Sequence, residues 1–220
     1  MRTRFFLNLL LLGSIAYSFP LKGSDRVVNY KAIGSIELSL HVFNPPDPAS
    51  SGKKPAIVFF HGGGWNNGSP VSMFKQCAYF ASRGMVAISA QYRLRDVHGT
   101  TPRECVMDGK SAIRWVRRHA AELGIDPDRV AAGGGSAGGH VAAAAGTVRG
   151  FNEESDDTTI SCRPDALVLF NPVIDNGPDG YGHERVKEYW QEFSPMHNLD
   201  EHAPPTIFMT FAALAVLVPS

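Results

Sequence analysis

Short apolar runs separated by helix-like segments are the feature that most constrains the fold of this chain. Residues 56–60 (AIVFF), 85–90 (MVAISA) and 166–170 (ALVLF) are almost continuously apolar. Such runs lack the polar alternation of a sheet with one wet face, so they are typical of strands buried on both faces. Weaker patterns indicate further strands at 36–43, 129–132 and 206–210.

Helical patterns lie between these strands. Residues 73–83 and 106–123 repeat apolar side chains at helical spacing, and each segment is followed by a glycine, a residue common just after helix C-termini. A third, Ala-rich helix is expected over 137–146. The alternation of strands and helices predicts an α/β protein with a mostly parallel central sheet and helices on both faces.

The composition excludes several classes of protein. Lys and Arg number 21 and Asp and Glu number 21, so the formal net charge is +0 and we expect no nucleic-acid partner. Cys77, Cys105 and Cys162 fit neither a disulfide scaffold nor a zinc pattern. The histidines have no metal-binding spacing either, so we expect no metal and no cofactor. The polar, acidic segment 150–161 is expected to be a surface loop.

The N-terminus has the features of a secretory signal. Arg2 and Arg4 precede an apolar run over 5–15, and small residues follow at 16 and 18. The run is shorter than the roughly 20 residues that a membrane span needs. We therefore expect residues 1–18 to be a signal peptide cleaved near Ser18. The mature chain, 19–220, is expected to be a single secreted or periplasmic domain without a stable membrane span.

A glycine-rich segment at 133–139 (GGGSAGG) directly follows a predicted strand and opens a predicted helix. Within it, residues 134–138 match G-x-S-x-G, the nucleophile elbow, with Ser136 as the serine. The serine of such an elbow sits on a strained turn, and glycines on either side avoid clashes as the backbone reverses. The pattern predicts that Ser136 is a nucleophile.

The same glycines also fit a dinucleotide-binding fingerprint. Gly133, Gly135 and Gly138 match G-x-G-x-x-G. That motif needs an acidic residue about 20 positions later at the end of a second strand. Asp156 and Asp157 have the right distance, but no strand precedes them, and several strands precede the glycines. The dinucleotide interpretation is therefore the less favoured one.

A second glycine-rich segment, HGGGW at 61–65, directly follows the strand predicted at 56–60. Backbone N–H groups of such a loop can converge on a developing oxyanion. An HGGG loop after one strand and a G-x-S-x-G elbow after a later one is the order that an α/β-hydrolase requires.

With both segments in place, the sequence resembles the α/β-hydrolase esterases related to the hormone-sensitive lipase group. The resemblance is strongest to their secreted acetyl-esterase and feruloyl-esterase-like (BD-FAE-type) branch, and it runs from about Val28 to Met209. The segments that carry it are HGGGW (61–65), QYRL (91–94), DGKSAIRWVRRHA (108–120), GIDPDRVAAGGGSAGGHVA (124–142) and LFNPVID (169–175).

The resemblance implies a carboxylic ester hydrolase and a role for several residues. Ser136 would be the catalytic nucleophile, and the oxyanion hole would be formed by the backbone N–H groups of Gly63, Gly64 and Ala137. His61 and Gly62 would hold the oxyanion loop in shape.

The family pattern is not followed at the C-terminus. The segment 204–210 (PPTIFMT) matches, but Phe211 stands where the family has glycine and Leu214 stands near the position of the triad Asp. No counterpart of the triad His follows. We therefore expect a hydrolase fold that lacks the last strand and helix, with impaired catalysis. Asp175, which follows the strand at 166–170, is a possible substitute acid, although a solvated loop carboxylate is the simpler interpretation.

Two classes of function follow from these patterns. The first is a serine esterase that cleaves short acyl or aryl esters of small or carbohydrate-linked alcohols through an acyl-enzyme on Ser136. The second is a non-catalytic relic or binding module that retains the fold and the oxyanion loop.

Overall fold

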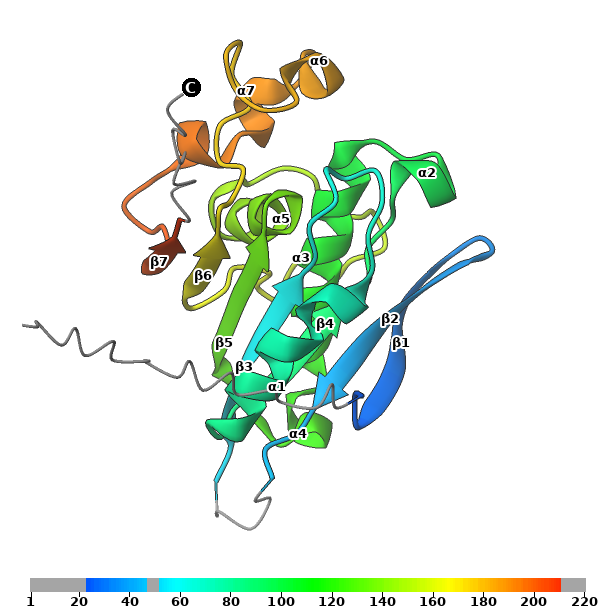
Figure 1. Cartoon of the computed structure of the whole chain (residues 1–220), viewed down its shortest axis with the longest axis vertical. Helices are drawn as coiled ribbons and strands as arrows, with labels where there is room; N and C mark the ends of the chain where they lie inside the picture. Colours follow the sequence, from blue (N-terminus) through cyan, green and yellow to red (C-terminus); the bar gives the residue numbers. More distant parts are fainter. Residues whose placement is uncertain (1–22, 47–51, 211–220) are drawn as a thin grey trace, which may run out of the picture.

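The computed structural model describes residues 23–46 and 52–210, so the predicted signal peptide and the segment 211–220 lie outside the described residues. A sheet of seven strands runs through the molecule in the order β1-β2-β4-β3-β5-β6-β7, with helices on both faces (Figure 1). Neighbouring strands from β4 to β7 are parallel, whereas β1–β2 and β2–β4 are antiparallel. The predicted α/β class with a mostly parallel sheet is confirmed. The strands are β1 (Arg26–Ile33), β2 (Ile36–Phe43), β3 (Lys54–Phe60), β4 (Val86–Ala90), β5 (Ile125–Gly135), β6 (Leu167–Phe170) and β7 (Thr206–Met209).

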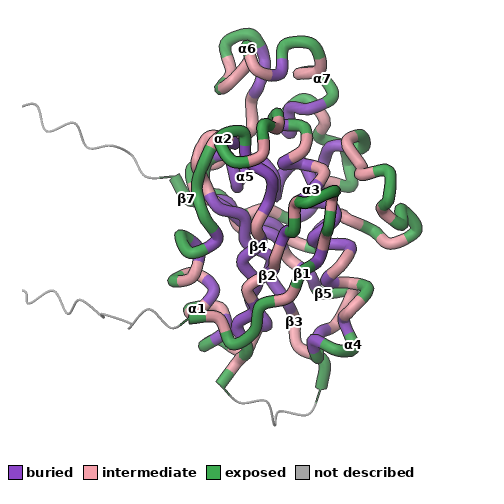
Figure 2. The backbone as a smooth tube through the Cα atoms, turned by 90° about the vertical axis from the view of Figure 1, so that its right-hand side faces the viewer, coloured by how far each residue is buried: buried purple, intermediate pink, exposed green. Residues whose placement is uncertain are grey.

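The central strand β3 shows why the sheet is covered on both faces. Ile57 and Phe59 point into one apolar core with α1 (Phe74–Ser82). Val58 and Phe60 point into a larger core on the opposite face, which includes side chains of α3 (Pro102–Arg118) and α5 (Ala137–Thr147). Because successive side chains of a strand alternate between faces, a continuous apolar run can serve both cores. Figure 2 shows the resulting buried centre of the molecule.

Helix α3 begins and ends where its sequence allows. Thr101 and Glu104 form a capping box at its start, with a proline at the first turn. The sequence predicted a single helix over 106–123, but the structure has two. Helix α3 ends at Arg118, and α4 (Ala120–Leu123) begins after His119. The remaining helices are short: α2 (Arg95–His98), α6 (His183–Val186), α7 (Trp190–Phe193), and the 3₁₀ turns η1 (Pro70–Met73) and η2 (Pro195–Asn198).

A buried ion network joins segments that are distant in the sequence. The Asp108 carboxylate of α3 accepts hydrogen bonds from Lys31 Nζ of β1 at 2.7 Å and from Arg93 Nη2 at 2.8 Å. Glu153 contacts the same two cations at 2.7 Å each. The predicted surface loop at 150–161 is therefore tied through Glu153 to Lys31 of β1 and to Arg93. Removing one partner would leave a buried charge uncompensated, which is costly.

Strand β1 was not anticipated from the sequence. Its residues alternate weakly, and only Tyr30 among them is buried. Periodicity detects strands by their buried side chains, so an outer strand with one buried residue gives little signal.

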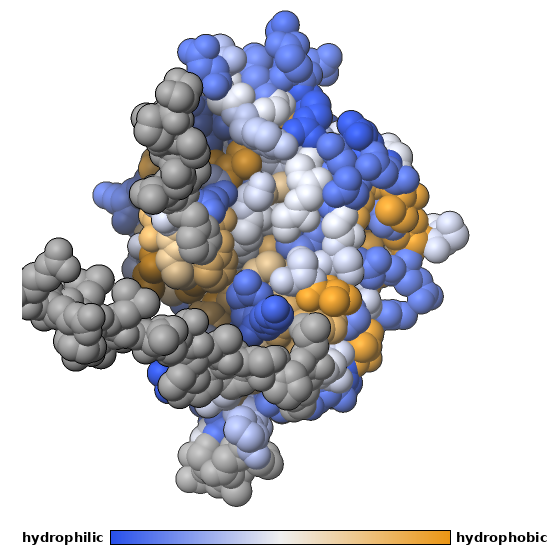
Figure 3. All heavy atoms as spheres, viewed as in Figure 1, coloured by the Kyte–Doolittle hydropathy of each residue, from blue (hydrophilic) through white to orange (hydrophobic). Residues whose placement is uncertain are grey.

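Among the residues that the structure describes, the last strand at one side of the sheet is β7, and its apolar side chains are exposed. Ile207 is 61% exposed and Phe208 is 54% exposed. These neighbouring residues point to opposite faces, so within the described residues neither face of β7 is fully covered. Figure 3 shows apolar surface gathered on this side of the molecule, over β6 and β7. An unpaired, apolar edge strand is a template for pairing with another chain.

We predict that Ile207→Lys reduces self-association of the protein, because a charge on an edge strand opposes pairing with a second copy. The association constant from sedimentation velocity should fall about tenfold or more, which corresponds to about 1.4 kcal/mol. Val97→Lys on α2 is the matched control, since Val97 is equally apolar and 69% exposed but lies outside the sheet. Equal association of both variants would contradict a role for the β7 edge.

Candidate active site

Ser136 lies on a strained turn between β5 and α5. Its backbone has φ 53° and ψ −120°, a conformation that residues other than glycine rarely adopt. Its N–H donates to Phe170 O at 3.1 Å, and its carbonyl accepts from the N–H groups of His140 and Val173 at 3.1 Å each. These bonds from three segments hold the strained backbone, while the residue itself is exposed. The geometry is that of a nucleophile elbow.

The glycines around Ser136 are required by close backbone approach. A Cβ on Gly138 would lie 2.1 Å from Phe60 O and 2.4 Å from His61 O. A Cβ on Gly134 would lie 2.5 Å from Phe60 O and from the Gly138 carbonyl. No real side chain tolerates such contacts, so only glycine lets the elbow pack against the end of β3.

This packing places the predicted oxyanion loop beside the serine. Phe60 pairs with Gly134 in the parallel register of β3 and β5, so both strands end at the same level. A Cβ built on Gly62 would lie 3.5 Å from Ser136 Cβ. The HGGGW loop and the elbow, which the sequence placed more than 70 residues apart, are thus neighbours in space.

His61 orients the first peptide of the loop. Its Nδ1 contacts Gly62 O at 2.8 Å, and because a carbonyl can only accept, this nitrogen carries the proton. The ring stacks on Tyr92 with centroids 4.3 Å apart, and Tyr92 donates to His61 O at 2.6 Å. Burial lowers the His61 pKa. In a trans peptide the N–H points opposite to the carbonyl, so a fixed Gly62 carbonyl fixes the direction of the Gly63 N–H.

The second peptide of the loop is held from the other side. Gly63 O accepts hydrogen bonds from the N–H groups of Asn66 at 3.0 Å and Asn67 at 3.2 Å. By the same geometry these bonds fix the direction of the Gly64 N–H. The assignment of Gly63 and Gly64 as oxyanion donors stays a prediction, and the loop has the rigidity that the role requires. No motif in the sequence predicted a role for Asn66 or Asn67, and the QYRL segment that contains Tyr92 did not indicate its contact with His61.

The third predicted donor, Ala137, is the first residue of α5. N–H groups in the first turn of a helix have no acceptor within the helix, and the helix dipole favours negative charge there. The assignment of Ala137 as an oxyanion donor stays a prediction.

Asp175 lies in a turn after β6. Its Oδ1 accepts from the Gly177 N–H at 2.8 Å and lies 3.9 Å from Nδ1 of His197, which is partly exposed. Within residues 23–46 and 52–210, neither Asp175 nor any histidine has a hydrogen bond to the Ser136 hydroxyl. The role of Asp175 as a substitute acid stays a prediction, and its contacts explain it as a turn residue.

His140 is a packing residue of α5. It is completely buried, with its ring 4.4 Å from Phe193 and 5.1 Å from Trp65, centroid to centroid. Burial lowers its pKa to about 3, so the ring is neutral at ordinary pH. The other histidines of this region have local partners: His183 Nδ1 contacts Asn176 O at 2.9 Å and His202 lies 3.7 Å from Glu201.

The residues that the dinucleotide interpretation needed have other partners. Asp156 pairs with Arg114 at 2.8 Å and Asp157 with Arg118 at 2.9 Å, both in the loop that follows α5. Neither carboxylate is at the end of a strand. Among the described residues there is also no group of three or more His, Cys, Asp or Glu side chains arranged to hold a metal ion.

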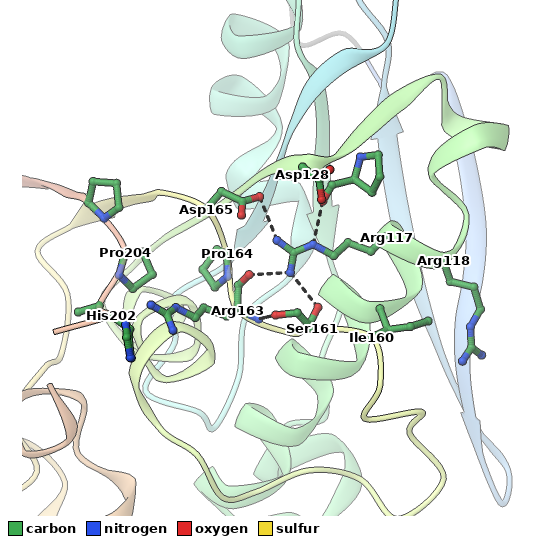
Figure 4. Close-up of a pocket in the computed structure, with 13 residues that line it drawn as sticks. Arg117, Arg118, Asp128, Ile160, Ser161, Arg163, Pro164, Asp165, His202 and Pro204 are labelled. Carbon is green, nitrogen blue, oxygen red and sulfur yellow. Dashed lines mark hydrogen bonds and ion pairs between the residues drawn. The ribbon is translucent and has the colours of Figure 1, made fainter. Parts of the chain in front are cut away.

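A pocket of about 640 Å³ lies at the opposite end of the sheet from Ser136. Residues that precede β6 and β7 line it, whereas Ser136 follows β5 (Figure 4). The Arg117 guanidinium at its wall donates to the carbonyls of Pro127, Ser161 and Arg163 and to the carboxylate of Asp165. These bonds show that Arg117 joins the start of β5 to the loop before β6, and the pocket is separate from the serine.

A strained serine between a strand and a helix, facing a glycine loop from the neighbouring strand of a mostly parallel sheet, defines the α/β-hydrolase class. The comparisons agree. The BD-FAE family model matches residues 40–178, and the chain belongs to this family of α/β-hydrolase esterases.

Relatives of known structure support the same assignment. Thermogutta terrifontis esterase 2, in the structure phosphoramylated by tabun, is 43% identical with a TM-score of 0.80, covering 87% of this chain and 72% of that one. Its propionate-bound structure has a TM-score of 0.79 at the same identity, covering 87% of this chain and 73% of that one. Carboxylesterase NlhH of Mycobacterium tuberculosis is 34% identical over 128 residues, which is 56% of this chain and 37% of the relative. The match thus spans little more than a third of that curated relative's length.

Among the described residues no helix combines the length and the apolar character needed to cross a bilayer.

We predict that Gly68→Ala lowers the free energy of unfolding by more than the positive φ of residue 68 alone would, because the added Cβ would also collide with the loop. A Cβ at this position, where φ is +118°, would lie 2.4 Å from Gly62 O and 2.5 Å from His61 Nδ1. Gly84→Ala is the matched control, because φ is +91° and nothing lies within 4 Å. The free energy of unfolding from urea titration should fall by about 1–3 kcal/mol more for Gly68→Ala. Equal losses would mean that the loop has room to adapt.

Burial of His140 predicts an acid-sensitive fold. The His140 pKa is about 3 in the folded state and near 6.5 when exposed, so between these values the unfolded chain binds a proton that the folded chain does not. Stability is therefore lost as the pH falls from 6.5 towards 3. His140→Phe removes this titration. Between pH 7 and pH 5 the wild type should lose roughly 2 kcal/mol more unfolding free energy than the variant. Equal losses of unfolding free energy in the wild type and in His140→Phe would contradict the assignment of this acid sensitivity to His140.

Proposed function

We propose that this protein is a serine carboxylic ester hydrolase in which Ser136 forms the acyl-enzyme. The single observation that carries the proposal is the contact between the elbow and the glycine loop, with Gly62 against Ser136. The hydroxyl oxygen of Ser136 loses its proton to a base and attacks the ester carbonyl carbon, and the carbonyl oxygen becomes an oxyanion. When this intermediate collapses, the ester C–O bond breaks and the alcohol leaves with a proton; water then hydrolyses the acyl-enzyme and releases the acid. The N–H groups of Gly63, Gly64 and Ala137 stabilise that charge.

We also propose that acylation is slow in this polypeptide. A serine hydroxyl is a weak nucleophile unless a base accepts its proton. In the described part of the chain no histidine side chain has a hydrogen bond to the Ser136 hydroxyl, and the acid–base pair of Asp175 and His197 has partners in its own turn. Loss of a triad member lowers turnover by orders of magnitude but leaves the contribution of the oxyanion hole.

The relatives support a proposal for the substrate class. Thermogutta terrifontis esterase 2 is described with propionate and with butyrate bound, and it is phosphonylated by sarin. We propose short acyl esters as substrates here, with a small or carbohydrate-linked alcohol as the leaving group. Export through the signal-like residues 1–18 is part of the same proposal and places the reaction in a secreted or periplasmic setting.

A chemical rescue experiment tests the proposal. The protein is incubated with a fluorophosphonate reagent, with and without added imidazole, and the adduct is located by peptide mass spectrometry. We expect slow modification of Ser136 that imidazole accelerates about 10²-fold or more, because imidazole supplies the missing base. Ser136→Ala is the control and should show no adduct under either condition. Hydrolysis of a short-chain nitrophenyl ester is followed in parallel.

Each result has a distinct meaning. Fast modification without imidazole would show that the chain supplies its own base, and the proposed impairment would be wrong. Absence of an adduct at every imidazole concentration would reject the hydrolase proposal and favour a non-catalytic binding module.

A further inference from the structure

Arg185 of α6 contacts the oxyanion loop across 121 positions of sequence. Its Nη1 donates to Gly64 O at 2.6 Å and to the side-chain Oδ1 of Asn66 at 3.1 Å. The guanidinium carbon lies 4.9 Å from the centroid of Trp65 and 5.4 Å from that of Tyr181. One side chain therefore binds three consecutive parts of the loop: a carbonyl, an indole and an amide.

The loop needs such support because its backbone is strained. Trp65 has φ 61°, and a bulky residue in this left-handed region costs of order 1–3 kcal/mol. Trp65 is nevertheless almost completely buried, with its ring edge-on to His140 and Phe193. The stacked guanidinium lies on this indole, and cation–π contacts contribute about 0.5–2 kcal/mol, more where water is excluded.

The contacts of Arg185 act on both sides of Gly64. The carbonyl of Gly64 is bonded to Arg185 directly. On the other side, the Asn66 N–H donates to Gly63 O. The Gly63 carbonyl and the Gly64 N–H belong to the same peptide group. Because Arg185 also holds the Asn66 side chain, it restrains the residue that orients this peptide. The predicted donor Gly64 thus has few remaining directions for its N–H.

Arg185 is itself placed by the segment after β6. Its N–H donates to Gly182 O at 2.9 Å, and a Cβ on Gly182, where φ is +74°, would lie 3.0 Å from Arg185 Nη2 and 3.0 Å from the Trp65 ring. Tyr181 lies above the loop as well, since a Cβ on Gly64 would be 3.0 Å from its hydroxyl. The turn at 181–182 therefore has the shape that the guanidinium stack requires.

We propose that Arg185 is a positioning residue that holds the oxyanion loop in its donor geometry through Gly64, Trp65 and Asn66. It does not touch the reacting atoms. The inference rests on the proposed function for its effect on rate, while its effect on the loop is independent of catalysis.

The test compares Arg185→Ala with Arg83→Ala. Arg83 also lies over an aromatic ring, with its guanidinium carbon 5.6 Å from the Tyr79 centroid, but it follows α1, and its ring partner is a residue of α1 and not of the loop. Hydrogen exchange of peptides spanning 61–68 is measured by mass spectrometry, and fluorophosphonate modification of Ser136 is measured with imidazole present. For Arg185→Ala we expect exchange of the loop to accelerate about tenfold or more and modification to slow about 10–100-fold.

Arg185→Lys should resemble Arg185→Ala in the modification rate, because an ammonium does not reproduce a planar group that stacks and bonds two acceptors. Arg83→Ala should change neither measurement. Unchanged loop exchange in Arg185→Ala would overturn the proposal. Faster exchange with an unchanged modification rate would also overturn it, since Arg185 would then serve stability alone. If the wild type itself forms no adduct, the hydrolase proposal fails, and loop exchange alone decides whether Arg185 holds the loop.

Discussion

The close backbone contact between the end of β3 and the first turn of α5 is the constraint on which the candidate site depends. Gly134 and Gly138 allow Phe60 O and His61 O to approach where any side chain would collide. The parallel register of β3 and β5 brings the elbow and the HGGGW loop to the same end of the sheet, and this contact packs them together. The strained backbone of Ser136 persists because hydrogen bonds to Phe170, His140 and Val173 hold it.

Around this contact the loop from 61 to 68 is held by several small interactions. His61 fixes one peptide, Asn66 and Asn67 fix the next, and Gly68 leaves the space that His61 occupies. Arg185 adds a contact from the far end of the chain. Such preorganisation is what an oxyanion hole requires, because donors that are already oriented cost no reorganisation during the reaction. The need for an oriented backbone also explains why glycines and buried polar groups are concentrated in the loop 61–68.

Buried charge plays a second, purely structural part. Asp108 with Lys31, Arg93 and Glu153 ties the outer strand β1 and the acidic loop to α3. The acidic loop looks solvated in the sequence, because charged residues are usually exposed. Lys31 of β1 and Arg93 pair with the carboxylates of Asp108 and Glu153, and this pairing makes their burial possible.

The sequence by itself determined the buried strands, the helices between them, the fold class and the two glycine motifs. Each of these follows from local chemistry: apolar periodicity, the conformational freedom of glycine, and the order of motifs along the chain. The tertiary structure alone decided the outer strand β1, the packing of Gly62 against Ser136, and the partners Tyr92, Asn66 and Arg185. These depend on contacts between segments tens of residues apart, and such contacts leave no periodic trace in a sequence.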